Sequence, residues 1–209
     1  MSGDREILKR VYDAKSRADL KEAYDSWAGS YENDLLSYGY RGATYAAALI
    51  GRHLPKGAEP ILDAGCGTGL IGETLAVAGF AEVQGLDLSP GMLEVARKKG
   101  CYRELHEAAL GDRLDFTNDH FAAVTALGVF TKGHVGPEAF GELLRITRPG
   151  GHMVISVRVD NDIGAPILAA VESLSSNGTW RQLDATPAFV SYPVTEPDIH
   201  HRVFVFQMA

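Results

Sequence analysis

The sequence predicts an α/β fold in which helices cover a mostly parallel, doubly wound sheet, and three observations lead to this prediction. From about residue 60 onward, short apolar runs alternate with helical patterns, which is typical of a parallel sheet covered by helices. The first sixty residues carry helical patterns and no strand candidate. With 209 residues, of which 45% are hydrophobic, the chain suits one compact domain with a sizeable core. We therefore expect a single domain, with a helical cap or lid over residues 1–58 and the α/β core over residues 59–209.

Three segments of the predicted cap have helical patterns, namely "EILKRVYDA", "LKEAYDSWAGSYENDLL" and "ATYAAALIGRHL". Asp19 followed by Glu22 resembles a capping box at the start of the second segment. In the same segment Tyr24, Trp27 and Tyr31 recur at a spacing of three to four residues, so they share one face of a helix. This aromatic face has two interpretations, because it can pack in the core or contact a ligand.

The predicted core begins with two pairs of strand and helix. The run "EPILDA" predicts the first strand, and after a glycine-rich loop "LIGETLAVAG" predicts a helix that ends at Gly79. "AEVQGLDL" predicts the second strand. The helix that follows, in "SPGMLEVARKKG", has complete boundary signals, because Ser89 is a good N-cap, Pro90 fits the first helical position and Gly100 ends the helix.

The second half of the core continues this alternation. "ELHEAAL" predicts a third strand, "FAAVTALG" a fourth, and "PEAFGELLRIT" a helix. "RPGG" then turns the chain into a fifth strand, "HMVISVRV", and the helix "APILAAVESL" leads to "WRQL". The last run, "RVFVFQM", alternates well enough to be a strand near the far edge of the sheet.

The glycine-rich loop predicts a nucleotide-type ligand. A strand, Gly65-x-Gly67-x-Gly69 and a helix reproduce the layout in which glycines let a ligand touch the backbone. Asp87 ends the second strand, eighteen residues after Gly69, where a carboxylate can accept both hydroxyls of an adenosine ribose. The alternative is a tight turn between strand and helix with no ligand.

Two details distinguish between adenosine ligands. A dinucleotide site has its third glycine three residues after the second, whereas here it comes after two, and the next residue is Leu70. Asp63 would repel a pyrophosphate but attract an ammonium group. S-adenosylmethionine, with its amino-acid tail, sulfonium and ribose, fits better than a nicotinamide nucleotide. An oxidoreductase is therefore disfavoured, while a protein that binds S-adenosylmethionine without catalysis remains open.

At this point the chain resembles a known family, the class I S-adenosylmethionine-dependent methyltransferases. "ILDAGCGTG" resembles their first motif and "GLDLSPGML" their second. Together with "YDSWAGSYENDLLSYGYR" and "LGVFTKGHV", these motifs are similar to the Williams-Beuren syndrome chromosome region methyltransferase-like group. The resemblance implies a Rossmann-like core with a seven-stranded sheet of order 3-2-1-4-5-7-6, whose last strand is antiparallel. It also implies methyl transfer that leaves S-adenosyl-L-homocysteine.

The resemblance implies a set of cofactor-binding residues. The methionine part would be lined by Asp63, Gly65, Cys66, Gly67, Gly69, Leu127 and Gly128. Asp87 would hold the ribose, and the adenine would meet Leu88, Met92, Asp112, and Arg113 or Leu114. In similar proteins the aromatic face of Tyr24, Trp27 and Tyr31 closes over the cofactor. Arg41 could pair with the cofactor carboxylate, or it could be a solvated arginine at a helix end.

The acceptor side is less constrained. After the fourth strand the chain reads "LGVF", without the Asn/Asp-Pro-Pro-Tyr or Phe motif of enzymes that methylate amino groups of adenine or glutamine. A small organic acceptor, methylated at oxygen, nitrogen or carbon by direct in-line displacement, is expected. Phe130 and Thr131 would border it, and His134 could act as a general base near neutral pH. The alternative is an ordinary loop with His134 exposed.

Bulk properties restrict the partners. A net charge of −7 without a long Lys/Arg run argues against nucleic acid. The N-terminus has no apolar core of signal-peptide type and no apolar run approaches ~20 residues, so we expect a cytoplasmic protein without a membrane partner. Cys66 and Cys101 lie at no metal-site spacing, so no metal is expected. The oligomeric state stays open.

Overall fold

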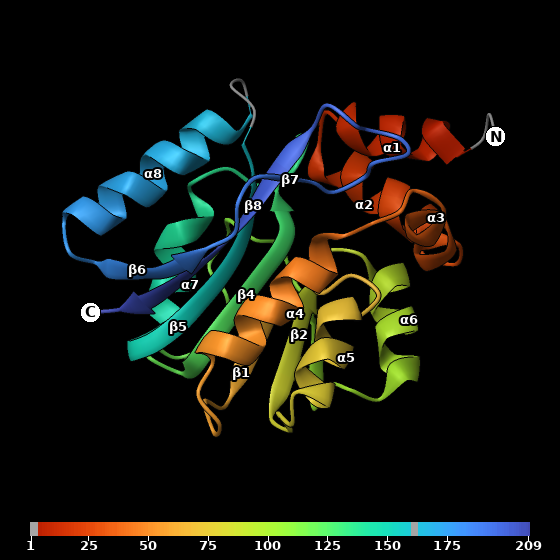
Figure 1. Cartoon of the computed structure of the whole chain (residues 1–209). Helices are drawn as coiled ribbons and strands as arrows, with labels where there is room; N and C mark the ends of the chain where they lie inside the picture. Colours follow the sequence, from red (N-terminus) through yellow and green to blue (C-terminus); the bar gives the residue numbers. More distant parts are fainter. Residues whose placement is uncertain (1–3, 160–162) are drawn as a thin grey trace.

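The structure is a computed structural model that describes residues 4–159 and 163–209. In these residues eight strands form one sheet of order β3-β2-β1-β4-β5-β8-β6, and the short β7 pairs with β8 (Figure 1). The strands are β1 Ile61–Ala64, β2 Val83–Asp87, β3 Glu104–Glu107, β4 Phe121–Phe130, β5 Thr147–Arg158, β6 Trp180–Ala185, β7 Phe189–Val190 and β8 His200–Met208. Strands β1 to β5 pair in parallel, whereas β8 is antiparallel to both β5 and β6.

The predicted fold class and strand order are confirmed. Without the two-residue β7, the order corresponds to 3-2-1-4-5-7-6 with an antiparallel last strand. The last run lies near the far edge of the sheet, as expected, because β8 is next to the edge strand β6. Its burial does not alternate: Val203, Phe204, Val205 and Phe206 are all buried, as in a strand covered on both faces. The edge is formed by β6, which begins at the predicted "WRQL" connection.

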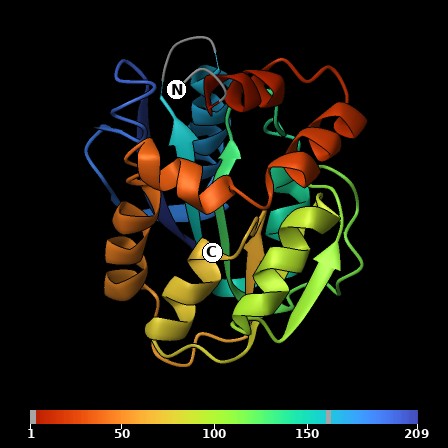
Figure 2. The ribbon, with the colours of Figure 1, turned by 90° about the vertical axis from the view of Figure 1, so that its right-hand side faces the viewer.

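Helices cover both faces of the sheet, as Figures 1 and 2 show from two sides. One apolar core contains α4 (Gly42–His53) and α5 (Leu70–Val77), and the other contains α7 (Ala139–Ile146) and α8 (Gly164–Ser176). The helix α6 (Pro90–Lys99) has the predicted boundaries, since the Ser89 hydroxyl accepts a hydrogen bond from the Met92 N–H and Gly100 caps the end in a left-handed conformation.

Beyond the carboxyl ends of the parallel strands lie α1 (Asp4–Tyr12), α2 (Arg17–Trp27) and α3 (Tyr31–Ser37), which share a separate apolar cluster (Figure 1). The stretch expected as one helix is thus two, with a turn at residues 28–30. The predicted capping box is wrong, because Ser16 is the N-cap and accepts a hydrogen bond from the Asp19 N–H. The third helix of the predicted cap, α4, packs against the sheet.

Among the described residues, no helix combines the length and the apolar character that crossing a membrane requires.

Candidate active site

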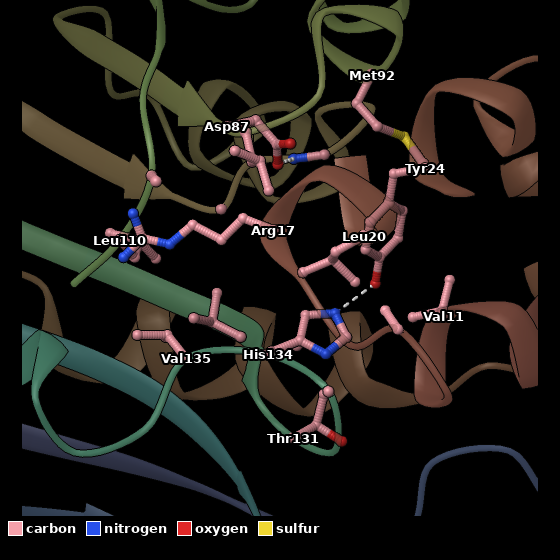
Figure 3. Close-up of a pocket in the computed structure, with 18 of the residues that line it drawn as sticks. Val11, Arg17, Leu20, Tyr24, Asp87, Met92, Leu110, Thr131, His134 and Val135 are labelled. Atoms are coloured by element: carbon pink, nitrogen blue, oxygen red, sulfur yellow. Dashed lines mark hydrogen bonds between the residues drawn. The ribbon is translucent and has the colours of Figure 1, made fainter. Parts of the chain in front are cut away.

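A cavity of about 500 Å³ lies between the carboxyl ends of the central strands and the α1–α2 pair (Figure 3). This volume is in the range of sites for small molecules and cofactors. The cavity brings together most of the residues that the sequence singled out. Its lining includes Tyr24, Trp27, Tyr31, Gly65, Gly67, Asp87, Leu88, Met92, Leu127, Gly128, Thr131 and His134.

The glycine loop after β1 forms part of the cavity wall. Gly65 has a φ of +77°, and a Cβ there would lie 2.5 Å from Cγ2 of Val129. Gly67 also has a positive φ, +53°, but a Cβ at this position would meet nothing within 4 Å. Because Gly67 lines the cavity, the open space at its Cα is available to a ligand that contacts the backbone. This observation fits the predicted cofactor.

Asp87, at the end of β2, is tied to the same loop. Its Oδ2 accepts a hydrogen bond of 2.8 Å from the Gly67 N–H, and its Oδ1 accepts one of 2.9 Å from the Ser89 N–H. Burial raises the pKa of the carboxyl group, while the backbone hydrogen bonds act in the opposite direction. Each oxygen keeps acceptor capacity beyond its one bond, so the carboxylate can still accept from a bound hydroxyl.

Asp63 has a different environment from the one expected. It is 1% exposed and lies outside the cavity lining, where Oδ2 accepts a hydrogen bond of 2.6 Å from the Tyr102 hydroxyl and Oδ1 one of 2.8 Å from Thr125. Burial raises its pKa to about 6. Both oxygens are therefore used within the protein, and the expected attraction of Asp63 for an ammonium group acts at most indirectly.

The aromatic face of α2 combines both interpretations left open by the sequence. Tyr24 and Trp27 stack at 6.1 Å between ring centroids, and Trp27 meets Tyr31 edge-on at 4.7 Å. All three rings belong to the α1–α3 cluster, with Trp27 only 3% exposed. All three also line the cavity. The face is thus both a packing surface and a wall of the site.

His134 lies opposite this wall, on the segment that follows β4. Its Nε2 is 2.6 Å from the Tyr24 hydroxyl, and its Nδ1 is 2.8 Å from the carbonyl oxygen of Lys132 (Figure 3). Burial lowers the pKa of the imidazole, so the neutral form is favoured. The alternative of a simply exposed loop histidine does not describe this geometry.

Several predicted residues lie outside the cavity lining. Phe130 is 1% exposed and stacks on Phe140 at 4.8 Å in the core, so its expected place beside the acceptor is wrong. The Cys66 side chain is buried and lies next to Gly85, beneath the loop. The remaining residues outside the lining are Arg41, Gly69, Asp112, Arg113 and Leu114. Arg41 is the N-cap of α4, Asp112 and Arg113 are exposed, and Leu114 is in the core.

Other lining residues were not predicted. From α1 and its end come Leu8, Val11 and Tyr12, and from distant loops come Tyr40 and Tyr192. The segment after β3 contributes Ala108, Ala109 and Leu110. The rule that ligands bind at the carboxyl ends of parallel strands could have found this last segment, because β3 ends at Glu107. Tyr192 has no such local signal, because it lies between β7 and β8.

Polar contacts fix α2 over the cavity from two sides. Oδ1 of Asp25 accepts hydrogen bonds from the Ser89 hydroxyl and the Gly91 N–H at the start of α6. On the other side Arg17 forms an ion pair with Asp112, in the loop after β3, and Lys21 forms one with Glu107, at the end of β3. The Asp112 side chain thus helps to hold α2 over the cavity, whereas the family resemblance implied a contact with the adenine.

Comparison with known proteins agrees with this geometry. Residues 61–151 match the family model described as "Methyltransferase domain". Methyltransferase-like protein 27 of Homo sapiens is 34% identical over 191 residues, which cover 87% of this chain and 78% of that protein. A demethylmenaquinone methyltransferase of Chlorobaculum parvum is 34% identical over 157 residues, covering 72% of this chain and 64% of that one. The dTDP-3-amino-3,6-dideoxy-alpha-D-glucopyranose N,N-dimethyltransferase of Streptomyces fradiae is 32% identical, with coverages of 78% and 68%.

The fold is also similar to that of solved structures. The crystal structure of the [4+2]-cyclase SpnF superposes with a TM-score of 0.71 at 17% identity and covers 93% of this chain and 97% of that one. At this identity the likeness shows the fold alone, whereas the sequence relatives show the family. The narrower Williams-Beuren group stays a prediction. The chain belongs to the methyltransferase domain family and is a class I S-adenosylmethionine-dependent methyltransferase, with S-adenosyl-L-methionine as its cofactor.

Proposed function

We propose that the protein methylates a small-molecule acceptor at an oxygen, nitrogen or carbon atom by direct in-line displacement. The observation that carries this proposal is that one roofed cavity holds the glycine loop and Asp87 on one side and the Tyr24–His134 pair on another. Since α1 and α2 lie over the strand ends, an acceptor has to enter this cavity beside the cofactor (Figure 1).

The floor of the cavity suits the parts of the cofactor. The open backbone at Gly67, with Gly65 beside it, would hold the methionine part, and Asp87 would accept from the ribose hydroxyls. Leu88 and Met92 would pack on the adenine, and Tyr24, Trp27 and Tyr31 would cover the cofactor from α2. When bound, S-adenosylmethionine supplies a methyl group on a positively charged sulfur.

Positioning accounts for much of the expected rate. Holding two reactants in line can supply roughly 7–11 kcal/mol of barrier lowering. Here the protein would position the reactants between two fixed walls of the cavity. The glycine loop is held by the Asp87–Gly67 hydrogen bond, and α2 is held by the hydrogen bonds of Asp25. A general base adds ~10²- to 10⁴-fold where the nucleophile has to lose a proton, and His134 is the candidate.

The acceptor side of the cavity is lined by Leu8, Val11, Thr131 and Val135, with His134 among them. These side chains come from α1 and from the segment after β4. The names of two relatives, a demethylmenaquinone methyltransferase and a nucleotide-sugar N,N-dimethyltransferase, describe small acceptors of different chemistry. Their likeness supports a small acceptor and leaves its methylated atom open.

The test is turnover. The purified protein is incubated with S-adenosylmethionine and pools of small molecules, and S-adenosylhomocysteine is measured against a no-acceptor control. Acceptor-dependent S-adenosylhomocysteine supports the proposal. Tight cofactor binding without turnover of any pool would favour a non-catalytic binding protein, and co-purified nicotinamide nucleotide would favour an oxidoreductase.

A further inference from the structure

Both ring nitrogens of His134 are engaged. The Lys132 carbonyl oxygen can only accept, so the contact at 2.8 Å places the proton on Nδ1. In the neutral ring Nε2 is then the acceptor, and the Tyr24 hydroxyl donates to it at 2.6 Å. An acceptor molecule in the cavity would therefore reach the base through the Tyr24 oxygen (Figure 3).

Contacts beside each residue hold the Tyr24–His134 pair in place. Asp25, next to Tyr24 in the chain, binds the start of α6 through Ser89 and Gly91. On the other side Gly133 has a φ of +79°, and a Cβ there would lie only 2.7 Å from the carbonyl oxygen of Val11. The segment with His134 thus lies directly against the end of α1, where only glycine fits. These contacts hold the two segments that carry Tyr24 and His134.

Apolar side chains line the cavity around the pair, together with tyrosine rings such as Tyr31, which meets Tyr24 edge-on at 6.4 Å. Leu8, Val11, Leu20 and Val135 line the same cavity. Of the other titratable lining residues, Lys15, Arg17 and Glu138 are exposed to solvent, His201 is buried at the start of β8, and Asp87 is held by the glycine loop. Arg17 is already paired with Asp112. Since an isolated charge is costly to bury among apolar side chains, this part of the cavity favours an uncharged acceptor.

We propose that Tyr24 relays a proton to His134 and that the acceptor is an uncharged compound with a weakly acidic hydroxyl, such as a phenol or an enol. This inference rests on the proposed function and names its substrate class. The acceptor oxygen forms a bond to the methyl carbon as the bond between that carbon and sulfur breaks, and the electron pair stays on sulfur. The hydroxyl proton of the acceptor passes to the Tyr24 oxygen while the Tyr24 proton passes to Nε2 of His134. The imidazolium later releases this proton to water.

The ionisation of the acceptor provides a sharp test. Wild-type protein, Tyr24→Phe and His134→Gln are assayed with substituted phenols, some un-ionised and others already ionised at the assay pH, and with matching benzylamines. Phenylalanine keeps the stacking on Trp27, and glutamine can keep a hydrogen bond to Tyr24 without accepting its proton. Tyr45→Phe is the matched control, because Tyr45 stacks on Phe189 and lies outside the cavity lining.

The relay predicts that both variants lower kcat for un-ionised phenols by at least about tenfold. With ionised phenols, which have no proton to lose, kcat should stay within about threefold of wild type. An equal loss with both kinds of phenol would overturn the relay, since a purely structural role does not depend on acceptor ionisation. Methylation of the amines alone, or of neither panel by a protein that binds S-adenosylmethionine, would overturn the acceptor class. Absence of cofactor binding in calorimetry would instead overturn the proposed function.

Discussion

The Tyr102 hydroxyl donates a hydrogen bond of 2.6 Å to Oδ2 of Asp63, beneath the glycine loop. The same hydroxyl accepts a bond of 3.2 Å from the N–H of Gly72 in α5. A Cβ at Gly72 would lie 2.3 Å from the Tyr102 ring, so this tyrosine can occupy its place only because position 72 is glycine. Tyr102 therefore connects the strand before the loop with the helix after it, and the shape of the loop depends on it.

We expect Tyr102→Phe to lower the free energy of unfolding by about 1–3 kcal/mol, because the variant leaves the buried Asp63 oxygen and the Gly72 N–H without this partner. Urea unfolding of wild type and variant measures the difference. Tyr45→Phe, which removes a hydroxyl from a ring stacked on Phe189, is the control. Equal stability of the two variants would show that the Tyr102 hydroxyl does not support the loop.

The effect should depend on pH. Burial raises the pKa of Asp63 from 3.8 to about 6, so between these values the folded protein holds a proton that the unfolded chain has released, and this group lowers stability as the pH rises. The Tyr102 hydrogen bond stabilises the ionised form and lowers the pKa. Without this hydrogen bond the pKa of Asp63 is higher still, so the pH range in which ionisation of Asp63 lowers stability extends to higher pH. The stability difference between wild type and Tyr102→Phe should thus be larger at pH 8 than at pH 5, and a difference that is the same at both values would contradict this account.

A comparison of two glycines with similar backbone geometry can distinguish the loss of a ligand contact from the effect of backbone strain. Gly67 and Gly100 both have positive φ values, +53° and +65°, and a Cβ at either position meets nothing within 4 Å. Gly67 lines the cavity, whereas Gly100 caps α6. Replacement of either glycine by alanine should lower the free energy of unfolding by about 1 kcal/mol. Only Gly67→Ala should weaken S-adenosylmethionine binding in calorimetry, by about tenfold or more, because its methyl group would occupy ligand space. Equal affinities of the two variants would remove Gly67 from the binding site.

The ion pairs of α2 should control access to the cofactor. Arg17 and Lys21 connect this helix to Asp112 and Glu107, and the pairs are largely exposed to solvent. The double variant Arg17→Ala/Lys21→Ala is expected to release S-adenosylmethionine several-fold faster in stopped-flow measurements, with high salt producing part of the same effect in wild type. A double variant with the wild-type release rate would mean that these pairs do not keep the roof closed.

His134→Ala is expected to lower turnover of a protonated acceptor by at least tenfold without changing cofactor affinity. Because burial lowers the pKa of His134, its neutral base form persists below the usual 6.5. The acidic limb of the wild-type kcat profile should therefore lie below pH 6.5 and be absent in the variant. Steady-state kinetics from pH 5 to pH 9 provide the check, and a variant with wild-type turnover would leave positioning as the whole catalytic account.

The local signals of the sequence were sufficient for the fold and for the floor of the site. Ser89, Pro90 and Gly100 predict α6 because helix boundaries depend on neighbouring residues. Gly65, Gly67 and Asp87, which line the cavity, follow from the same kind of signal, since their spacing along the chain reflects a compact unit of strand, loop and helix, whereas Gly69 lies outside the lining.

Features that depend on distant packing could not be predicted. Asp63 was expected to face the ligand, but its partner Tyr102 comes from 39 residues away and fills a space beneath the loop. Phe130 ends β4, near where an acceptor contact was expected, yet it stacks on Phe140 of α7 in the core. Similarly, the contact between Tyr24 and His134 joins residues 110 positions apart. No local pattern encodes such contacts.

The central claim is that Asp87 and the glycine loop bind S-adenosylmethionine, and calorimetric titration of wild type and Asp87→Ala tests it most directly. The wild type should bind at one site, and the variant should lose about 1.5–3 kcal/mol of binding free energy, roughly 10- to 150-fold in affinity, because a charged acceptor is removed. Urea unfolding of the same samples establishes that the variant is folded. A folded variant that binds within twofold of wild type, or a wild type that does not bind S-adenosylmethionine, would contradict the account.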